Sequence, residues 1–340
     1  MDGQRAKGAR DPGRLSGDER RRVLGVDLGG TKLAIGLVDE HLTLLDKTLG
    51  RTVTDSSEVC LANLLERLDE AVERFGPVAA IGIGTPSMVD FARGAIVASV
   101  NVPLVDVPLR DVVRERFSVP VVVDNDANVA CLAEHRFGAG KGTREMLMLT
   151  LGTGVGGGIV AHGQVYRGAS GAAAELGHMT IEMDGPANGN GCPNYGCLEV
   201  YASGRAIEER AQLSAERHPQ SALAQERRRG QPITGELVTR LAQRGDREAR
   251  AVLVETGRLL GVGITSLVNI FNPEMVVVGG GAAAAGELLL EPARRVVAER
   301  ALFPQRAQVR IVAAHFGADA GVLGAAALAM VEELGINGDT

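Results

Sequence analysis

Tryptophan is absent from this sequence, and aromatic residues together make up only 3% of its 340 positions. The core must therefore be built from aliphatic side chains, chiefly Val, Leu, Ile and Ala. Neither charge sign is in large excess, because charged residues account for 23% of the chain and the net charge is −6 at pH 7. With 45% hydrophobic residues, this is an ordinary globular composition. The chain is long enough to form two lobes.

What is missing also narrows the location and the partners. We find neither an apolar run long enough to span a membrane nor a secretory hydrophobic stretch near the start, so we expect a cytoplasmic protein without a membrane partner. The acidic balance argues against a broad nucleic-acid surface, so no nucleic-acid partner is expected. In residues 1–22, seven side chains are basic and few are apolar. We predict a disordered basic tail there, with an arm that binds a polyanion as the alternative.

Glycine, in contrast, is abundant, with 45 copies that gather at a few points between the expected elements. Apolar runs predict a strand pair around Gly29-Gly30 and a second pair around Gly152-Thr153-Gly154. Two halves of similar order, each opened by a glycine-rich hairpin, predict a duplicated α/β architecture. The expected strands span residues 23–27, 34–38, 78–83, 119–123, 146–151, 157–161, 275–278 and 309–313, and the expected helices span 57–74, 127–137, 203–243 with a break near Gly230, 247–271 and 319–333.

Both glycine turns carry the residues of a phosphate clamp. Glycines let backbone amides approach an anion closely, and in the first turn Thr31 adds a hydroxyl and Lys32 a positive charge. Asp27, at the end of the preceding strand, is suited to hold Mg²⁺ through water. The alternative is that each turn is only a tight hairpin. A Rossmann dinucleotide site would need a helix after the glycines, whereas a strand follows both turns. A Walker P-loop would need a Gly-Lys-Ser/Thr ending, which neither turn has.

A third glycine cluster, Gly279-Gly280-Gly281, follows a predicted strand and precedes an Ala-rich segment that predicts a helix. Such a turn suits flat contact with a base or a ribose. The alternative is a plain connection from strand to helix.

An acid-amide group, Asp124-Asn125-Asp126-Ala127-Asn128, stands at the end of the predicted strand 119–123. Ligands of α/β proteins bind at such carboxyl ends. A hydroxyl that accepts a phosphoryl group needs a carboxylate to take its proton, and Asp126 is the candidate. Asn125 can donate and accept, which suits a sugar diol. Helix capping is the alternative, and Asp124 is the stronger candidate for a cap or a spacer.

The four cysteines are Cys60, Cys131, Cys192 and Cys197. Disulfides are not expected in a reducing compartment. Glu175 and His178 precede the close pair Cys192 and Cys197, and His and Cys at such separations are typical of zinc. A core histidine is the alternative for His178. Tetrahedral zinc needs four ligands, and His178, Cys192 and Cys197 supply three.

Taken together, these segments resemble the ROK family of bacterial sugar kinases and repressors. The resemblance covers roughly residues 23–333. It is carried by Asp27-Leu28-Gly29-Gly30-Thr31-Lys32, by Asp124-Asn125-Asp126-Ala127-Asn128, and by Glu175-Leu176-Gly177-His178 with Gly196-Cys197-Leu198-Glu199.

The resemblance implies an α/β fold of the two-lobed actin-like ATPase (ribonuclease H-like) class with a ligand cleft between the lobes. The small lobe would comprise residues 23–136 plus 318–335, and the large lobe residues 137–317 with the zinc loop. Homodimers are a further expectation.

The resemblance also assigns roles to residues. Asp126 would be the catalytic base, and the sugar hydroxyls would be bound by Gly94, Asn101, Asn125, Glu175, His178 and Glu199. The ATP site, with Mg²⁺, would comprise Asp27, Gly29, Gly30, Thr31, Lys32, Gly152, Thr153, Gly154, Gly279, Gly280 and Gly281. One ring nitrogen of His178 would bind zinc and the other would face the sugar.

The chain departs from the family at the zinc motif, which usually reads Cys-x-Cys-Gly-x-x-Gly-Cys. Here Asn190 stands in place of the first Cys and Pro193 in place of the following Gly. Either Zn²⁺ takes another fourth ligand, or the loop is held without metal.

The sequence thus predicts a cytoplasmic ATP:hexose 6-phosphotransferase, with glucose as the first-choice substrate. N-acetylmannosamine, N-acetylglucosamine, fructose and allose are the alternative sugars, and polyphosphate is the alternative donor. A sugar-binding protein without turnover and a sugar-responsive repressor are the rivals from other classes. About 22 residues precede Val23, which we expect to be too few for the helix-turn-helix domain of such repressors.

Overall fold

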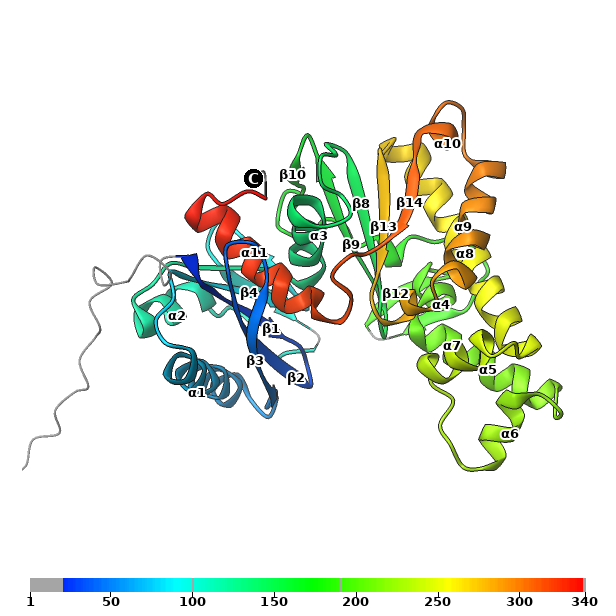
Figure 1. The fold of residues 1–340 in the computed structure, drawn as a ribbon, viewed down its shortest axis with the longest axis horizontal. Coiled ribbons are helices and arrows are strands. Elements are labelled where there is room, and N and C mark those ends of the chain that lie inside the picture. The colour runs from blue at the N-terminus through cyan, green and yellow to red at the C-terminus, as the bar shows by residue number, and fades with distance from the viewer. Residues whose placement is uncertain (1–20, 100, 190, 339–340) are drawn as a thin grey trace, which may run out of the picture. The chain divides into compact units, whose positions relative to one another are not determined.

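The computed structural model describes residues 21–99, 101–189 and 191–338 (Figure 1). The chain divides into two compact units: unit 1 takes Met1–Ala133 and Asp319–Thr340, and unit 2 takes Glu134–Ala318. It passes from unit 1 to unit 2 within α3 (Asp126–Phe137) and returns at the 3₁₀ helix η5 (Gly317–Asp319). The predicted tail, apart from its last two residues, lies outside the described residues.

Unit 1 is built on a five-stranded sheet in the order β3-β2-β1-β4-β7. Strands β1, β2 and β3 pair antiparallel, whereas β1, β4 and β7 pair parallel. The strands span Val23–Leu28 (β1), Lys32–Val38 (β2), Leu44–Arg51 (β3), Ala80–Thr85 (β4) and Val121–Asn125 (β7), and the main covering helices span Ser57–Phe75 (α1), Leu109–Phe117 (α2) and Ala320–Leu334 (α11).

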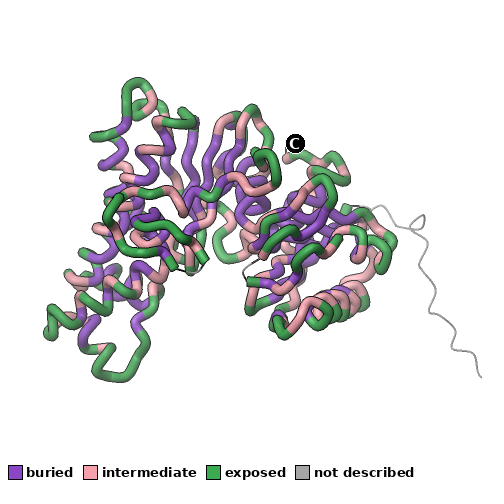
Figure 2. Tube along the Cα trace, turned by 180° about the vertical axis from the view of Figure 1, so that it is seen from behind, coloured by how far each residue is buried: buried purple, intermediate pink, exposed green. Residues whose placement is uncertain are grey.

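Successive residues of β1 and β4 point to opposite faces of the sheet, and a different helix covers each face. Leu24 and Ile81 belong to the cluster that contains Leu64 of α1. Gly25 and Gly82 point the other way, toward α11, because side chains alternate along a strand. A Cβ on Gly82 would lie 1.8 Å from the backbone oxygen of Ala325, so only glycine lets α11 come this close. Strands β1, β2, β4 and β7 are mostly buried, whereas the edge strand β3 is not, and Figure 2 colours the chain by burial.

Unit 2 repeats the same sheet pattern, with the order β10-β9-β8-β13-β14. Strands β8, β9 and β10 pair antiparallel, whereas β8, β13 and β14 pair parallel. The strands span Met146–Leu151 (β8), Val155–Ala161 (β9), Gln164–Val165 (β10), Met275–Gly279 (β13) and Arg310–Ala313 (β14). The duplicated α/β architecture predicted from the sequence is therefore present.

Helix α8 (Arg247–Phe271) is the central helix of unit 2 and packs against α5 (Gly204–Arg217), α7 (Gly235–Gln243) and α9 (Glu287–Arg300). By length and composition alone it is apolar enough to cross a membrane, contrary to the expectation that no such run exists. However, 61% of its most apolar window is buried inside the structure. Its apolarity is that of a core helix.

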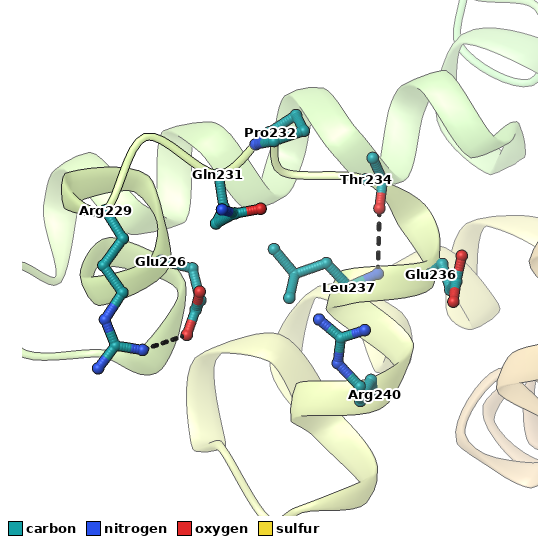
Figure 3. A pocket seen from close by; sticks show the side chains of 8 residues that line it. All are labelled: Glu226, Arg229, Gln231, Pro232, Thr234, Glu236, Leu237 and Arg240. Carbon is teal, nitrogen blue, oxygen red and sulfur yellow. Dashed lines mark hydrogen bonds and ion pairs between the residues drawn. The ribbon is translucent and has the colours of Figure 1, made fainter.

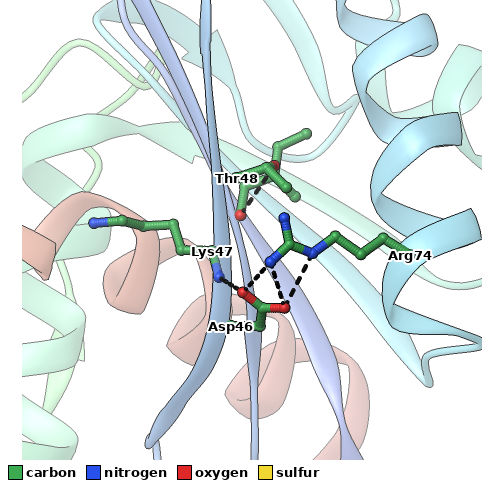
Figure 4. Close-up of polar contacts among 5 residues, drawn as sticks. Asp46, Lys47, Thr48 and Arg74 are labelled. Atoms are coloured by element: carbon green, nitrogen blue, oxygen red, sulfur yellow. Dashed lines mark hydrogen bonds and ion pairs between the residues drawn. The ribbon is translucent and has the colours of Figure 1, made fainter.

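Several elements were missed because their sequences lack a clear apolar period. The edge strand β3 carries polar side chains. One of them is Asp46, whose two carboxylate oxygens accept hydrogen bonds from Arg74 of α1 at 2.7–3.1 Å (Figure 4). The ammonium group of Lys47, the next residue in β3, donates a hydrogen bond to the carboxylate of Asp319 at 2.5 Å. The other unpredicted elements are α2, β5 (Ser87–Asp90), β6 (Ala95–Ser99), β10, η3 (Leu176–His178), β11 (Ala187–Gly189), β12 (Cys192–Tyr195), α4 (Glu199–Ala202), α9 and α10 (Gln305–Gln308).

Two predicted helices are corrected. The Ala-rich segment after the third glycine cluster is only a 3₁₀ helix, η4 (Gly281–Ala285), because Gly286 takes φ +59 and interrupts it before α9 begins. The stretch 203–243 forms three helices, α5, α6 (Ala222–Arg228) and α7.

Candidate active site

In unit 1, the carboxyl ends of three parallel strands bring polar residues to one edge of the sheet. Asp27 of β1 pairs in register with Gly84 of β4, and Gly84 pairs with Asp124 of β7. Thr85 likewise pairs with Asn125, and Asp126 follows as the first residue of α3. The sheet register thus gathers the predicted base and the predicted metal carboxylate at one edge.

Asn125, rather than Asp124, caps helix α3. Its Oδ1 accepts from the backbone N–H of Ala127 at 2.9 Å and of Asn128 at 3.2 Å. Asp124 is buried and accepts from the backbone of Asn125 and the side chain of Asn128. Asn125 thus takes the cap, one of the two roles (cap or spacer) expected for Asp124, whose Oδ1 instead accepts from the side chain of Asn128 in α3. The half-buried Asp126 accepts from Ala127 N–H at 2.8 Å.

A chain of three hydroxyls, two of them buried, leads from β4 to the segment that carries Asn101. Thr85 Oγ1 lies 3.1 Å from Ser87 Oγ, which donates to Ser99 Oγ at 2.9 Å. Ser99 in turn accepts from Val102 N–H at 3.1 Å. None of these three hydroxyls was among the predicted site residues.

Asn101 reaches the first glycine turn, whereas Gly94 does not. A Cβ on Gly30 would lie 2.8 Å from the backbone oxygen of Asn101. Gly94 has φ +62 at the tip between β5 and β6, and a Cβ there would meet Arg110 of α2 at 2.4 Å. The structure therefore shows that glycine at this position allows the turn to pack closely on Arg110.

The first glycine turn is tightly closed. Gly29 N–H donates to Lys32 O at 3.0 Å, and Thr52 Oγ1 donates to Gly29 O at 2.7 Å. Asp27 lies behind it, where burial raises the pKa of its carboxyl while the ammonium groups of Lys32 and Lys47 lower it again. Thr31 and Lys32 are exposed at the rim of the turn.

In unit 2, the second glycine turn is held by Glu199. Val155 N–H donates to Glu199 Oε2 at 2.8 Å, and a Cβ on Gly154 would lie 2.2 Å from the same oxygen. A residue predicted to bind sugar therefore touches a turn predicted to bind phosphate. The side chain of Glu199 is largely buried at 9% exposure.

The third glycine cluster packs directly on the second turn. Gly280 takes φ +83, and a Cβ there would lie 2.6 Å from the backbone of Leu151, which immediately precedes Gly152. Gly279 pairs in register with Thr150 of β8. These contacts bring the two predicted nucleotide segments of unit 2 together.

Glu175 precedes the short helix η3 and His178 is its last residue; η3 lies against the second turn because Gly177 leaves room for Val155. His178 Nε2 lies 3.7 Å from Glu175 Oε2. The other ring nitrogen, Nδ1, lies 3.1 Å from the side-chain nitrogen of Asn188. The histidine thus faces Glu175 with one nitrogen and the cysteine hairpin with the other.

The predicted zinc ligands are brought together. His178, Cys192 and Cys197 each offer a ligand atom, and these atoms lie within 4.8 Å of one another. The two sulfur atoms are 4.0 Å apart. Thiolates on one tetrahedral zinc, each about 2.3 Å from the ion, lie about 3.8 Å apart. The donor set fits zinc in chemistry and spacing, while Asn190 falls outside the described residues.

The loop that carries these ligands is shaped by Gly196 and Tyr201. Gly196 takes φ +59, and a Cβ there would lie 1.7 Å from Glu182 O. The Tyr201 hydroxyl donates to Glu182, and burial first and this carboxylate second raise the pKa of Tyr201 to about 12. The sequence predictions missed Glu182, Tyr201 and Asn188, whose roles depend on contacts across the loop.

A pocket of about 350 Å³ lies elsewhere in unit 2, among α6, α7 and the segment between them (Figure 3). Arg229 pairs there with Glu226 at 2.7 Å, and Thr234 caps α7 by accepting from Leu237 N–H at 3.2 Å. None of the predicted site residues lines it. Its lining residues are Glu226, Arg229, Gln231, Pro232, Thr234, Glu236, Leu237 and Arg240.

The arrangement of turns, acid-amide group and cysteine hairpin agrees with the comparison to known proteins. The sequence pattern of the ROK family matches residues 23–332. The chain belongs to the ROK family. A glucokinase from Halalkalibacterium halodurans is 36% identical over 320 residues, which is 92% of this chain and 96% of that protein. A xylose repressor from Caldicellulosiruptor bescii is 31% identical over 342 residues, which is 97% of this chain and 84% of that protein.

A solved structure gives the same picture. The ROK family glucokinase from Streptomyces griseus, in complex with glucose and AMPPNP, superposes with a TM-score of 0.80 at 37% identity, covering 90% of this chain and 98% of that chain. The predicted actin-like ATPase fold class is thereby confirmed. The glucokinase relatives support sugar kinase activity for this ROK protein.

Proposed function

We propose that this protein is an ATP-dependent hexose kinase that phosphorylates the 6-hydroxyl of glucose. The observation that carries the proposal is Asp126, a half-buried carboxylate at the first position of α3, next to Asn125 and on the same sheet edge as Asp27. A phosphoryl acceptor hydroxyl needs such a base within reach. Glucose is favoured because glucokinases are among the relatives and glucose is bound in the Streptomyces griseus structure.

In this proposal the sugar is oriented by hydrogen bonds. The Asn125 amide keeps Oδ1 on the helix cap, so its Nδ2, which reaches Ser87 O at only 3.4 Å, is the group that donates to a sugar hydroxyl. Glu199 keeps Oε2 on Val155 N–H and presents Oε1 as the acceptor. Asn101, Glu175 and His178 complete the set. Asp126 takes the proton of the 6-hydroxyl as that oxygen attacks the γ-phosphate in line.

Mg-ATP is the proposed donor. Backbone amides of the two glycine turns neutralise charge that develops on the transferred phosphoryl group. Asp27 is the residue that would hold the Mg²⁺ of the nucleotide, through water. The third glycine cluster would border the adenosine, because Gly280 lies against the backbone that leads into the second turn.

The test is a coupled phosphorylation assay with Mg-ATP across hexoses and N-acetylhexosamines, repeated with polyphosphate as donor. We expect glucose to be turned over fastest. Asp126→Asn keeps the shape but removes the proton acceptor, so its rate should fall about 10²- to 10⁴-fold. The matched control is Asp69→Asn, at an exposed carboxylate of unit 1 that pairs with Arg116. A near-normal rate in Asp126→Asn would refute the assignment of the base, and turnover of another sugar would replace glucose while keeping the mechanism.

A sugar-responsive repressor is the second candidate, because a xylose repressor is 31% identical to this chain. A repressor needs the sugar contacts but no proton acceptor for chemistry. The position of Asp126 at the edge that also carries Asp27 therefore favours the kinase.

A further inference from the structure

A buried amide stands where the cysteine hairpin lacks a donor. The side chain of Asn188 is 4% exposed, and its Oδ1 has no hydrogen-bond partner among the described residues. Leaving such a buried oxygen unpaired costs about 1–3 kcal/mol. One end of this buried amide is therefore without a partner within the part of the chain that the structure describes.

The other end of the amide faces the predicted zinc ligands. Asn188 Nδ2 lies 3.1 Å from His178 Nδ1, and the same side chain hydrogen-bonds to Cys197. Rotation of an amide by 180° exchanges its nitrogen and oxygen and preserves its shape. The oxygen then faces the ring nitrogen and the sulfur. On one tetrahedral zinc, a nitrogen and an oxygen ligand lie about 3.3 Å apart, close to the spacing found here.

The hairpin itself brings Asn188 to this point. Strands β11 and β12 pair antiparallel, with Ala187 opposite Tyr195 and Gly189 opposite Cys192. The ladder is irregular between Ala187 and Gly189, at Asn188. The pairing places Asn188 beside the Cys192 strand, although it precedes that cysteine by four residues.

We propose that the side-chain oxygen of Asn188 is the fourth ligand of a zinc site whose other ligands are His178, Cys192 and Cys197. This differs from the match to the family's zinc motif in the sequence, which put Asn190 in the place of the missing cysteine. Two thiolates balance the charge of Zn²⁺, so a neutral imidazole and a neutral amide leave the partly buried site without net charge. The ion would hold the hairpin to η3 and so fix His178, whose Nε2 faces Glu175.

The experiment measures metal binding by the full chain without substrate, so a failed kinase assay leaves it unaffected. Zinc per chain is counted by mass spectrometry after dialysis, affinity is measured by competition with a chromophoric chelator, and Co²⁺ replaces zinc as a spectroscopic probe. We expect one zinc per chain, and for Co²⁺ a tetrahedral d–d band with thiolate charge transfer. Asn188→Leu, of similar size but without a donor, should lose at least about tenfold in zinc affinity and shift the Co²⁺ band.

Three further variants complete the design. Asn188→Asp retains the oxygen and should keep or raise the affinity, and Asn188→Cys should raise it and intensify the thiolate charge transfer. These two keep the test valid even where Asn188→Leu folds poorly, which circular dichroism would reveal. Asn190→Ala is the matched control and should bind zinc like the parent chain. The proposal is overturned if the parent binds no stoichiometric zinc, if Asn188→Leu binds as tightly as the parent, or if Asn190→Ala is the variant that loses the metal.

Discussion

At the scale of single residues, Asp27 shows a functional group held at a cost in stability. Burial disfavours its charged form and raises the pKa of the carboxyl above the ordinary value of 3.8, and Lys32 and Lys47 offset this only in part. Gly321 of α11 permits the close approach, because a Cβ there would lie 2.5 Å from Asp27 Oδ2. Because burial of this carboxylate costs stability, its position is better explained by binding of a cation or a phosphate-bound metal than by a contribution to folding.

Substitution of Asp27 should therefore change stability with pH. With a raised folded pKa, the folded state binds more proton than the unfolded chain between about pH 4 and the folded pKa, so stability falls as pH rises through that window. Asp27→Asn removes this titration. We expect its free energy of unfolding to exceed that of the parent at pH 7, with the gain shrinking toward pH 4, while kinase activity falls.

Urea unfolding at both pH values measures this difference, with the exposed Asp55→Asn as the control. Equal stability of parent and Asp27→Asn at pH 7, or a loss in the variant, would contradict the argument.

At the scale of elements, the contact between α11 and the sheet of unit 1 depends on glycine. Gly25 of β1 and Gly82 of β4 both face the helix, and a Cβ on either would lie 2.0 Å or less from a backbone oxygen of α11. Backbone atoms on both sides leave no flexible side chain to move aside. The packing of this helix is therefore the most sensitive contact of the unit.

We expect Gly82→Ala to lower the free energy of unfolding by about 1–3 kcal/mol, because overpacking forces the helix and the sheet apart. The matched control is Gly235→Ala, at the start of α7, where a Cβ would meet nothing within 4 Å. That change should raise stability by about 0.4–1 kcal/mol, because it reduces the freedom of the unfolded chain. Urea midpoints at constant slope measure both, and similar effects of the two substitutions would show that α11 does not limit the packing.

At the scale of the whole molecule, kinase and repressor predict opposite behaviour toward DNA. The net charge of −6 opposes binding to a polyanion such as DNA. A protein that does bind DNA by neutralising its phosphates loses affinity for it steeply as the salt concentration rises. We expect turnover of about 1–100 s⁻¹ with the preferred sugar and no salt-sensitive DNA binding.

Fluorescence anisotropy with random and operator-like duplexes at low and moderate salt, beside the coupled assay, measures both properties. Tight, salt-dependent DNA binding without sugar turnover would move the protein to the repressor class.

Chain order and residue type were sufficient for much of this protein. The two glycine hairpins, the strand that ends in Asp124-Asn125-Asp126 and the Cys192–Cys197 pair are local patterns, and each depends on neighbours a few residues away. The duplicated α/β architecture followed from their repetition, whereas the actin-like ATPase fold class was implied by the resemblance to the ROK family. The edge strand β3 and the hairpin β11–β12 were missed, because their residues are polar or small and find partners only across the unit.

Tertiary structure alone decided how these patterns are used. It made Asn125 the helix cap, attached Glu199 to Val155, packed Gly280 on Leu151, and put Gly94 into a packing contact with Arg110. It also brought Asn188, rather than a residue in the cysteine frame, to His178 and Cys197. The Asn125 cap is a local contact whose residue type the sequence offered, whereas the other contacts join residues further apart in the chain, through a geometry that is set by sheet register and helix packing and leaves no local signal in the sequence.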